Sequence, residues 1–311
     1  MQTILVTGYE NPDLDGVACM IAYAEFLNAR GKHAVPAIIG KPSSEAQYVL
    51  SFLCIPDLPD ISAIQYSSIV LVDASETYVL QGMIDLAKVI EVIDHRKTND
   101  AYNFVNAKVQ IELVGSAATL VAERLHTAGF HPSKNAATLL YTAIVSNTVN
   151  FQANVTTARD KTMAAWLKPQ ASLPETFVHD MFVFKSQFSV SLKQVLFDDL
   201  AIAVFAGKRV GICQLEIVNL QEFMQKNKQE LLQALRDVSV EENLPYNVLT
   251  CIDVEKAHNM FMTADAASQQ LLEKALNITI KDNTAIRQGV LMRKEIGPQM
   301  KDVLERLTEL K

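Results

Sequence analysis

The 311-residue sequence lacks any apolar run close to the roughly 20 residues that a membrane-spanning helix needs. It also lacks a low-complexity tract and an internal repeat. Its composition, 49% hydrophobic and 20% charged, is that of a globular protein, and a chain of this length usually divides into two domains. We therefore expect a globular protein with two separate cores and no membrane partner.

Cysteine is scarce, and its few residues are not paired in the sequence. The four cysteines stand far apart, with no C-x-x-C pair, at Cys19, Cys54, Cys213 and Cys251. No signal-peptide pattern comes before them. Isolated thiols of this kind fit a reducing compartment better than one in which disulfides form. We expect reduced cysteines and a cytoplasmic location.

An excess of positive charge is absent as well. The sequence has 28 Lys and Arg against 35 Asp and Glu, a formal net charge of −7. Binding along an extended nucleic acid needs Lys and Arg clustered over a broad surface. The charge balance therefore argues against extended nucleic acid as a partner, although it allows a small basic pocket.

Short β-branched runs alternate with helical stretches in the first half of the chain. The predicted strands cover residues 3–7, 33–39, 69–73, 89–94 and about 109–114. The predicted helices cover residues 17–29, 44–52, about 78–86, 117–128 and 136–146. Strands joined by helices need right-handed crossovers and form a parallel sheet covered on both faces. We expect the α/β class, with a mostly parallel, doubly wound sheet in a domain of residues 1–167.

A linker is predicted after Trp166, where the segment LKPQASLPE has two prolines and no apolar periodicity. We place this linker at residues 168–175 and a second, smaller α/β domain at residues 176–311. Its predicted elements are strands at 201–205, 209–215 and 248–253 and helices at 220–238 and 266–276.

Acidic side chains follow three of the predicted strands of the first domain. Asp13 and Asp15 lie in the loop after the first strand, the third strand ends at Asp73, and the fourth ends at Asp94 and His95. Ligands of open parallel sheets bind beyond the carboxyl ends of the strands. We therefore expect four carboxylates and an imidazole at one edge of the sheet.

Carboxylates gathered in this way repel one another unless a cation or a proton neutralises them. Carboxylate oxygens with one imidazole suit Mn²⁺, Mg²⁺ or Co²⁺, as one or two ions, and paired ions would activate a shared water. A single Asp after a strand is most often a helix cap or a turn residue. The pattern over three strands favours a metal or phosphate site over three separate caps. Gly115-Ser116 opens another predicted helix, where a cap is usual and an anion could also bind.

These acidic segments resemble the motifs of the DHH phosphoesterase superfamily, most closely those of the manganese-dependent (family II) inorganic pyrophosphatases. The similar segments are NPDLDG, LVDASE, VIDHRK, IELVGSAATLVAERL, LLYTAIVSNTVNFQANVTTARDK and NTAIRQGVLMRKEIGP. They occur in the order of the family and cover most of the chain. The DHR variant of the third motif and the VGSAATLVAER stretch resemble the prune and exopolyphosphatase branch.

The resemblance implies a role for each matching residue. It implies that Asp13 binds one metal ion, that Asp15 and His95 bind the other, and that Asp73 bridges the two. Asn147 stands in the fourth metal-ligand region. Of these residues, the resemblance makes Asp73 and His95, together with Arg96, the catalytic set. It also implies that the substrate's phosphates contact Arg96 and, from the second domain, Lys185, Arg293 and Lys294.

Three positions depart from the family pattern. Tyr9 and Arg96 stand where the family has histidine, and Asn147 stands where it has aspartate. A neutral phenol is a poor metal ligand, so the ion beside Tyr9 should bind weakly or not at all. Arg96 stays charged and can bind phosphate through two parallel hydrogen bonds, but it cannot serve as an acid.

The function implied is metal-dependent hydrolysis of a small phosphoanhydride, pyrophosphate or a short polyphosphate, by a metal-activated water. A nucleotide phosphodiesterase of the same superfamily, or a weakly active or inactive relative that binds a phosphate ligand, are the alternatives. The resemblance further implies a homodimer formed through the first domain.

Overall fold

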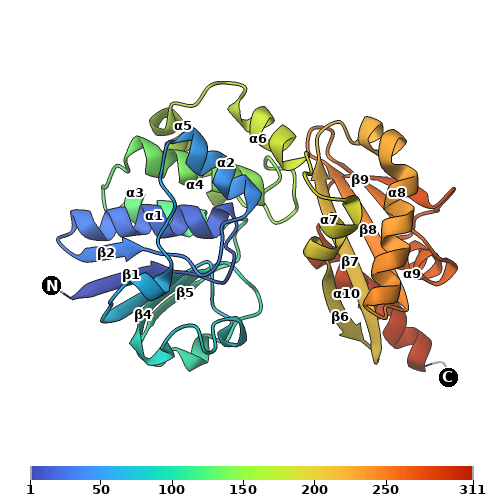
Figure 1. Ribbon diagram of the computed structural model, residues 1–311, viewed down its shortest axis with the longest axis horizontal. Coiled ribbons are helices and arrows are strands. Elements are labelled where there is room, and N and C mark those ends of the chain that lie inside the picture. The colour runs from blue at the N-terminus through green and yellow to red at the C-terminus, as the bar shows by residue number, and fades with distance from the viewer. Residues whose placement is uncertain (1, 310–311) are drawn as a thin grey trace. The chain divides into compact units, whose positions relative to one another are not determined.

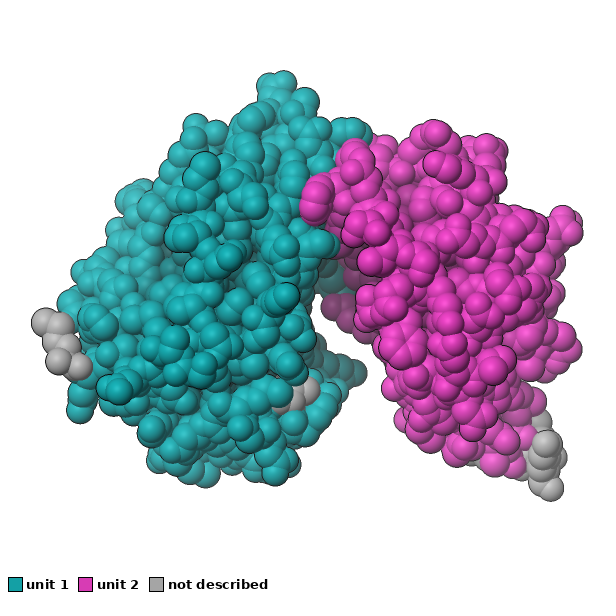
Figure 2. All heavy atoms as spheres, in the orientation of Figure 1, with its two compact units in different colours: residues 1–151, 155–181 teal, residues 152–154, 182–311 magenta. Residues whose placement is uncertain are grey.

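The computed structural model describes residues 2–309, and the chain divides into two compact units (Figure 2). Unit 1 comprises residues 1–151 and 155–181, and unit 2 comprises residues 152–154 and 182–311. The chain passes to unit 2 after Met181, later than the predicted linker. Residues 168–171 of that linker belong to α5 (Ala158–Ala171), because the burial of Leu167 and Ala171 continues the helix past Pro169.

Unit 1 contains a five-stranded parallel sheet, as predicted. The strands are β1 (Thr3–Thr7), β2 (His33–Pro36), β3 (Ser68–Val72), β4 (Val89–Asp94) and β5 (Lys108–Ile111). Their order is β2-β1-β3-β4-β5, and every neighbouring pair is parallel. From β1 the chain goes first to one side of the sheet and then to the other, so the order reverses between β1 and β3. Ligand sites of open α/β sheets lie at such a switch point.

Helices cover one face of this sheet (Figure 1). They are α1 (Leu14–Ala29) and α3 (Ala117–Thr127), with α4 (Lys134–Asn147) and α5 packed on these helices, while α2 (Ser44–Phe52) contacts α1. On the other face, Leu5, Leu71 and Val92 pack against Leu80 and Phe104 from loops and short 3-10 turns. The sheet is therefore buried on both sides, which explains its continuous apolar strands.

The helix predicted at residues 78–86 does not form. Two 3-10 turns, Thr77–Val79 and Leu86–Lys88, stand there instead. Between them Gly82 has a φ of +80°, a left-handed conformation that ends any regular helix. The apolar residues of the segment, Leu80 and Ile84, still reach the core.

Unit 2 contains a mixed five-stranded sheet. Its strands are β6 (Ala201–Phe205), β7 (Lys208–Ile217), β8 (Tyr246–Asp253), β9 (His258–Thr263) and β10 (Thr284–Gln288). The order is β10-β9-β8-β7-β6, and only β7 and β8 pair in parallel. The remaining helices are α6 (Phe177–Lys185), which crosses the boundary between the units, and α7 (Leu192–Asp199), α8 (Leu220–Glu241), α9 (Ala266–Leu276) and α10 (Arg293–Glu309). One core lies between the sheet and α7 and α8, and a second lies against α9 and α10. Within residues 2–309, no helix has the length and apolar character to span a membrane.

Candidate metal centre

Three of the predicted side chains meet at the carboxyl edge of the unit 1 sheet. One ligand atom each from Asp15, Asp73 and His95 lies within 4.8 Å of the other two. Asp15 is in the first turn of α1, Asp73 directly follows β3, and His95 directly follows β4. The switch of strand order at β1 and β3 brings these chain segments together, as expected from the strand ends.

Asp73 carries the atom that most needs a cation. The residue is buried, with a φ of +53°, so its backbone adopts a left-handed turn at the end of the strand. Its Oδ1 is buried and accepts no hydrogen bond from the described residues. The nearest cationic atoms are His95 Nε2 at 3.5 Å and Arg96 Nη2 at 3.6 Å, both beyond good hydrogen-bonding distance. A divalent ion would satisfy this oxygen.

His95 is oriented as a metal ligand. Its Nδ1 lies 3.0 Å from the carbonyl oxygen of Val114 and donates to it in the neutral ring. That bond leaves the lone pair of Nε2 facing Asp73 Oδ1 and, at 3.8 Å, Asp15 Oδ2. Metal-binding histidines are usually held in this way, with the second nitrogen bound to a carbonyl or a carboxylate.

Asp15 is fully buried and bound to the protein on both oxygens. Oδ1 accepts from Ser116 Oγ and from the backbone N–H of Ala118, and Oδ2 accepts from the backbone N–H of Ala117 and from Asn147 Nδ2, all within 2.6–2.8 Å. The carboxylate thus lies at the N-terminus of α3, where free N–H groups favour an anion. The anion that Gly115-Ser116 could receive is a side chain of the protein itself.

Charge and burial act together on the protonation of the centre. Burial raises the pKa of the Asp73 carboxyl to about 7, against the opposing charge of Arg96. Burial also raises the pKa of Asp15. For His95, burial lowers the pKa, but the adjacent carboxylate of Asp73 outweighs burial and raises it to about 9. Without an ion, the centre therefore holds protons that a metal must displace.

Affinity for Mn²⁺ is accordingly expected to rise with pH. Between about pH 6 and 7 both Asp73 and His95 hold a proton that binding releases, so affinity should rise by up to about 100-fold per pH unit. Between about pH 7 and 9 only His95 still does so, and the rise should be about tenfold per unit. Isothermal titration calorimetry in buffers of different ionisation heat measures both affinity and proton release. Equal affinity at pH 6 and pH 8 would contradict this account.

A second buried carboxylate, Asp160, holds the loop that receives Asp15. It accepts from the backbone N–H of Gly115 at 3.0 Å, from Thr119 Oγ1 at 2.5 Å and from Thr157 Oγ1 at 2.7 Å. Gly115 has no room for a side chain, because a Cβ there would lie 2.5 Å from Thr148 Cγ2. The loop is thus fixed by packing on one side and by Asp160 on the other.

Replacing Asp160 by alanine is expected to lower the free energy of unfolding of unit 1 by about 3 kcal/mol, the scale for losing hydrogen bonds to a charged group. Urea denaturation followed by the fluorescence of Trp166, the single tryptophan, measures the change. Asp57→Ala is the control, since Asp57 is an exposed loop carboxylate of the same unit. An unchanged unfolding midpoint in Asp160→Ala would show that the loop does not depend on this carboxylate.

The other predicted ligands of unit 1 lie around the three-residue cluster. Asp13 is not a member of it, and its Oδ1 caps α1 by accepting from the backbone N–H of Asp15 and of Gly16. Asn147 donates to Asp15, so its amide nitrogen points to the centre's carboxylate. The hydroxyl of Tyr9 accepts from the backbone N–H of Asp13 at 3.1 Å, and burial raises the pKa of the phenol well above 10. Ligation of an ion by Asp13 or Asn147 stays a prediction.

Arg96 is bound to the protein on several sides. Its guanidinium donates to the backbone oxygen of Asp73, lies 3.5 Å from Asp94 Oδ2, and stands 5.0 Å from the ring centre of Tyr9. Its side chain keeps 30% of its surface exposed, and it lines an open hollow of about 480 Å³ with Tyr9, Glu10, Glu76, Tyr78 and Met83. A phosphate contact from Arg96 stays a prediction, and its exposed part faces this hollow.

The three predicted phosphate contacts of the second domain lie in unit 2. Lys185 Nζ is 2.8 Å from Glu216 Oε2, and Arg293 pairs with Asp199 at 2.9 Å and also donates to the carbonyl oxygens of Asp199 and Ile212. Lys294 is exposed in the first turn of α10. The acidic partners Glu216 and Asp199 were not predicted. The phosphate roles of Lys185, Arg293 and Lys294 stay predictions.

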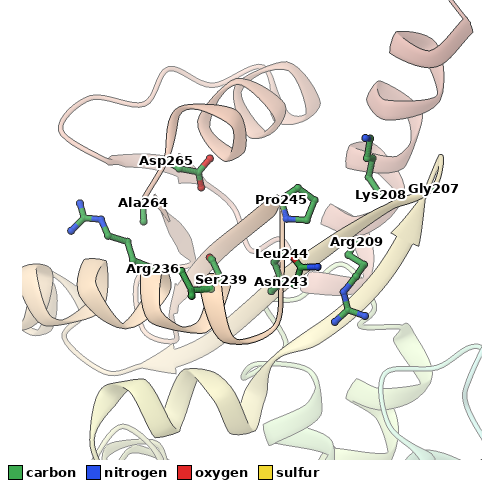
Figure 3. A pocket seen from close by; sticks show the side chains of 11 residues that line it. Gly207, Lys208, Arg209, Arg236, Ser239, Asn243, Leu244, Pro245, Ala264 and Asp265 are labelled. Atoms are coloured by element: carbon green, nitrogen blue, oxygen red, sulfur yellow. The ribbon is translucent and has the colours of Figure 1, made fainter.

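Unit 2 also has a hollow of about 840 Å³ beside the end of α8 (Figure 3). Lys208 and Arg209 come from β7, and Arg236 comes from α8 (Figure 3). Arg209 donates to the carbonyl oxygen of Glu242 at 3.0 Å, at the end of that helix. No cluster of metal-ligating side chains occurs here within the described part of the chain, and the metal centre belongs to unit 1.

Comparisons with known proteins agree with this geometry. Residues 3–144 match the model of the DHH family, N-terminal domain, and residues 179–303 match the DHHA2 domain. The manganese-dependent inorganic pyrophosphatase of Methanothrix thermoacetophila is 31% identical over 94% of this chain and 95% of its own. That of Bacillus subtilis is 27% identical over 98% and 99%. A crystal structure from Methanococcus jannaschii assigned to family II inorganic pyrophosphatases superposes with a TM-score of 0.74 at 27% identity, over 97% of this chain and 99% of that one. The chain, with its DHH and DHHA2 domains, belongs to the manganese-dependent, or family II, inorganic pyrophosphatases.

Proposed function

We propose that this protein hydrolyses pyrophosphate with the help of Mn²⁺ held by Asp15, Asp73 and His95. The observation that carries the proposal is the buried Oδ1 of Asp73, which accepts no hydrogen bond from residues 2–309 but faces an imidazole nitrogen and a second carboxylate. Full-length similarity to pyrophosphatases named as manganese-dependent supports the same reaction.

In the proposed reaction, each residue of the centre has a separate role. An ion bound there would lower the pKa of a water and neutralise phosphate charge. Asp73 takes up a proton near neutral pH only without the ion, because burial raises its pKa to about 7, and it would hold the ion as a carboxylate. Asp15, fixed by α3, and His95, fixed by Val114, keep their ligand atoms in place before the ion arrives. Arg96 presents a permanent positive charge to a phosphate in the adjoining hollow and orients it without donating a proton.

The test is an assay of phosphate release from pyrophosphate by the full chain, with Mn²⁺, Mg²⁺ or Co²⁺ after removal of metal by a chelator. We expect activity that is lost with the chelator and restored best by Mn²⁺. His95→Asn should lose most of the restored activity, whereas His33→Asn, a change of the same kind at an exposed position, should retain it. Pyrophosphate hydrolysis that survives complete metal removal would reject the proposal.

A nucleotide phosphodiester is the second candidate substrate. The hollow beside Arg96 is lined by the rings of Tyr9 and Tyr78, and Tyr78 is 69% exposed. An exposed ring offers a stacking surface for a base, for which pyrophosphate has no use. Parallel assays with tripolyphosphate and with linear and cyclic dinucleotides separate the candidates, since turnover of a dinucleotide faster than pyrophosphate would make it the substrate.

We further propose a cytoplasmic homodimer formed through the free edge of β5. Val109 on that strand is 41% exposed, and Leu113 just after it is 64% exposed. An exposed strand edge with apolar residues is a template for pairing with a second copy. Light scattering should give a dimer for the native chain and a monomer for Val109→Lys. All four cysteines are free thiols, which supports the cytoplasmic location.

A further inference from the structure

Tyr9 stands at a sequence position to which the family pattern assigns a ligand of a second ion. That ion would be held by Asp13, by Asp73 and by the residue at position 9. Here the hydroxyl of Tyr9 accepts a hydrogen bond from the backbone of Asp13. The ring lies beside Gly16, since a Cβ there would stand 3.8 Å from Tyr9 Cε1 and 3.7 Å from Asp73 Oδ2. The ring edge of Tyr9 and Asp73 Oδ2 therefore both lie close to Gly16.

The carboxylate of Asp13 also caps a helix. Its Oδ1 accepts from Asp15 N at 2.9 Å and from Gly16 N at 3.1 Å, as the N-cap of α1. A carboxylate that caps a helix satisfies N–H groups that would otherwise lack a partner. The residues present thus fit a second divalent ion poorly, because one of them is a phenol and Asp13 has only Oδ2 outside the helix cap.

The guanidinium of Arg96 already lies beside the carboxylate of Asp73. Arg96 Nη2 is 3.6 Å from Asp73 Oδ1, and Nη1 is 3.5 Å from Asp94 Oδ2. Its guanidinium lies over the ring of Tyr9, and such a cation–π contact favours the charged plane in that position. Tyr9 and Arg96, two of the residues that depart from the family pattern, are therefore in contact, and each stabilises the position of the other.

Arg96 already supplies one positive charge at this centre. Asp13, Asp15, Asp73 and Asp94 bring four negative charges. One divalent ion and Arg96 together offset three of them. A second divalent ion would bring the total of positive charges to five and would stand next to a guanidinium, which repels it.

We propose that this centre binds one divalent ion instead of two, and that the guanidinium of Arg96, held by Tyr9 and Asp94, takes the place of the second ion at Asp73. The inference rests on the proposed function only in that both use the ion at Asp15, Asp73 and His95. A substrate phosphate would then lie between one metal ion and one arginine.

The number of ions can be counted without any assay of activity. Metal-free protein is titrated with Mn²⁺ in a calorimeter, and the bound ion is examined by electron paramagnetic resonance. We expect one ion per chain and the six-line spectrum of an isolated Mn²⁺. Two ions per chain with a spin-coupled spectrum would overturn the inference and leave the proposed function standing. Binding of no ion would overturn both.

A variant that restores the family's side chains provides the positive test. Tyr9→His with Arg96→His removes the ring and the guanidinium together, and we expect it to bind two ions per chain with coupled spins. Tyr9→Phe with Arg96→Lys is the matched control, since it keeps a ring and a charge and should still bind one. If the histidine pair also binds one ion, these two residues do not determine the number.

Discussion

Asp73→Asn is expected to weaken Mn²⁺ binding at least about 100-fold and to reduce pyrophosphate hydrolysis by a similar factor. Loss of a partner that merely supports a metal ligand typically costs 10–100-fold, and Asp73 is itself a ligand in the proposed centre. Asparagine is the informative replacement because it tolerates the left-handed backbone, with a φ of +53°, that alanine would strain. Calorimetric titration with Mn²⁺ gives the affinity, and phosphate release gives the rate.

Asp57→Asn makes the same atomic change at an exposed loop position of unit 1 and should alter neither quantity. The comparison separates loss of the ligand from a general loss of negative charge. If Mn²⁺ raises the melting temperature of Asp73→Asn as much as that of the native chain, Asp73 does not bind the ion.

Asn147→Asp is expected to have opposite effects with and without metal. Asn147 Nδ2 lies 2.6 Å from Asp15 Oδ2 and donates to it. A carboxylate in that place would repel Asp15 and leave a buried charge uncompensated, so the metal-free protein should lose about 3 kcal/mol of unfolding free energy at pH 8. With Mn²⁺ bound, the same carboxylate becomes an additional ligand, and affinity should rise. Chemical denaturation with a chelator and with saturating Mn²⁺ measures both effects.

The destabilisation should shrink as the pH falls, because repulsion raises the pKa of the new carboxyl and a proton then removes the repulsion. Asn150→Asp places the same change in the exposed turn after α4, and its effect should stay within about 0.5 kcal/mol. Equal destabilisation of Asn147→Asp with and without Mn²⁺ would show that position 147 does not face the ion.

Elements with a strong local pattern could be predicted from the sequence. The structure has β1, β4 and β6 over the predicted residues, and the same holds for α2 and α9. Each strand among them is a short β-branched or apolar run, and each helix begins after a capping Ser43 or Asp265. Patterns of this kind involve only residues that are close together in the chain, so these elements can be predicted from the sequence.

α10 was not predicted, because Gly297 and Pro298 normally interrupt a helix. In the fold Ile296, Met300 and Leu304 are buried at a spacing of four residues, and packing against the sheet outweighs the local preference. A Cβ at position 297 would lie 3.7 Å from Phe205 Cζ, so the glycine stands where the helix meets strand residues. Such contacts arise between distant parts of the chain and leave no local signal.

The convergence of Asp15, Asp73 and His95 could be predicted, because parallel strands place their carboxyl ends at one edge. Their partners could not. Apart from the nearby thiol of Cys19, the donors to Asp15 come from residues 116–118 and 147, more than 100 residues further along the chain. The ion pair of Arg293 with Asp199 spans 94 residues. The partner of each charged side chain depends on how the helices and strands pack against one another. A local sequence pattern does not show this packing.

The four hydrogen bonds from α3, its cap and Asn147 make Asp15 part of the framework of unit 1 as well as a ligand. Asp73 Oδ1 has no such second task, since no described residue donates to it. In a lineage that gave up catalysis, selection for folding alone would keep an aspartate at position 15, while position 73 would be free to drift. The residue at position 73 is therefore the better guide to which relatives still bind an ion, and an aspartate at position 15 marks only a shared architecture.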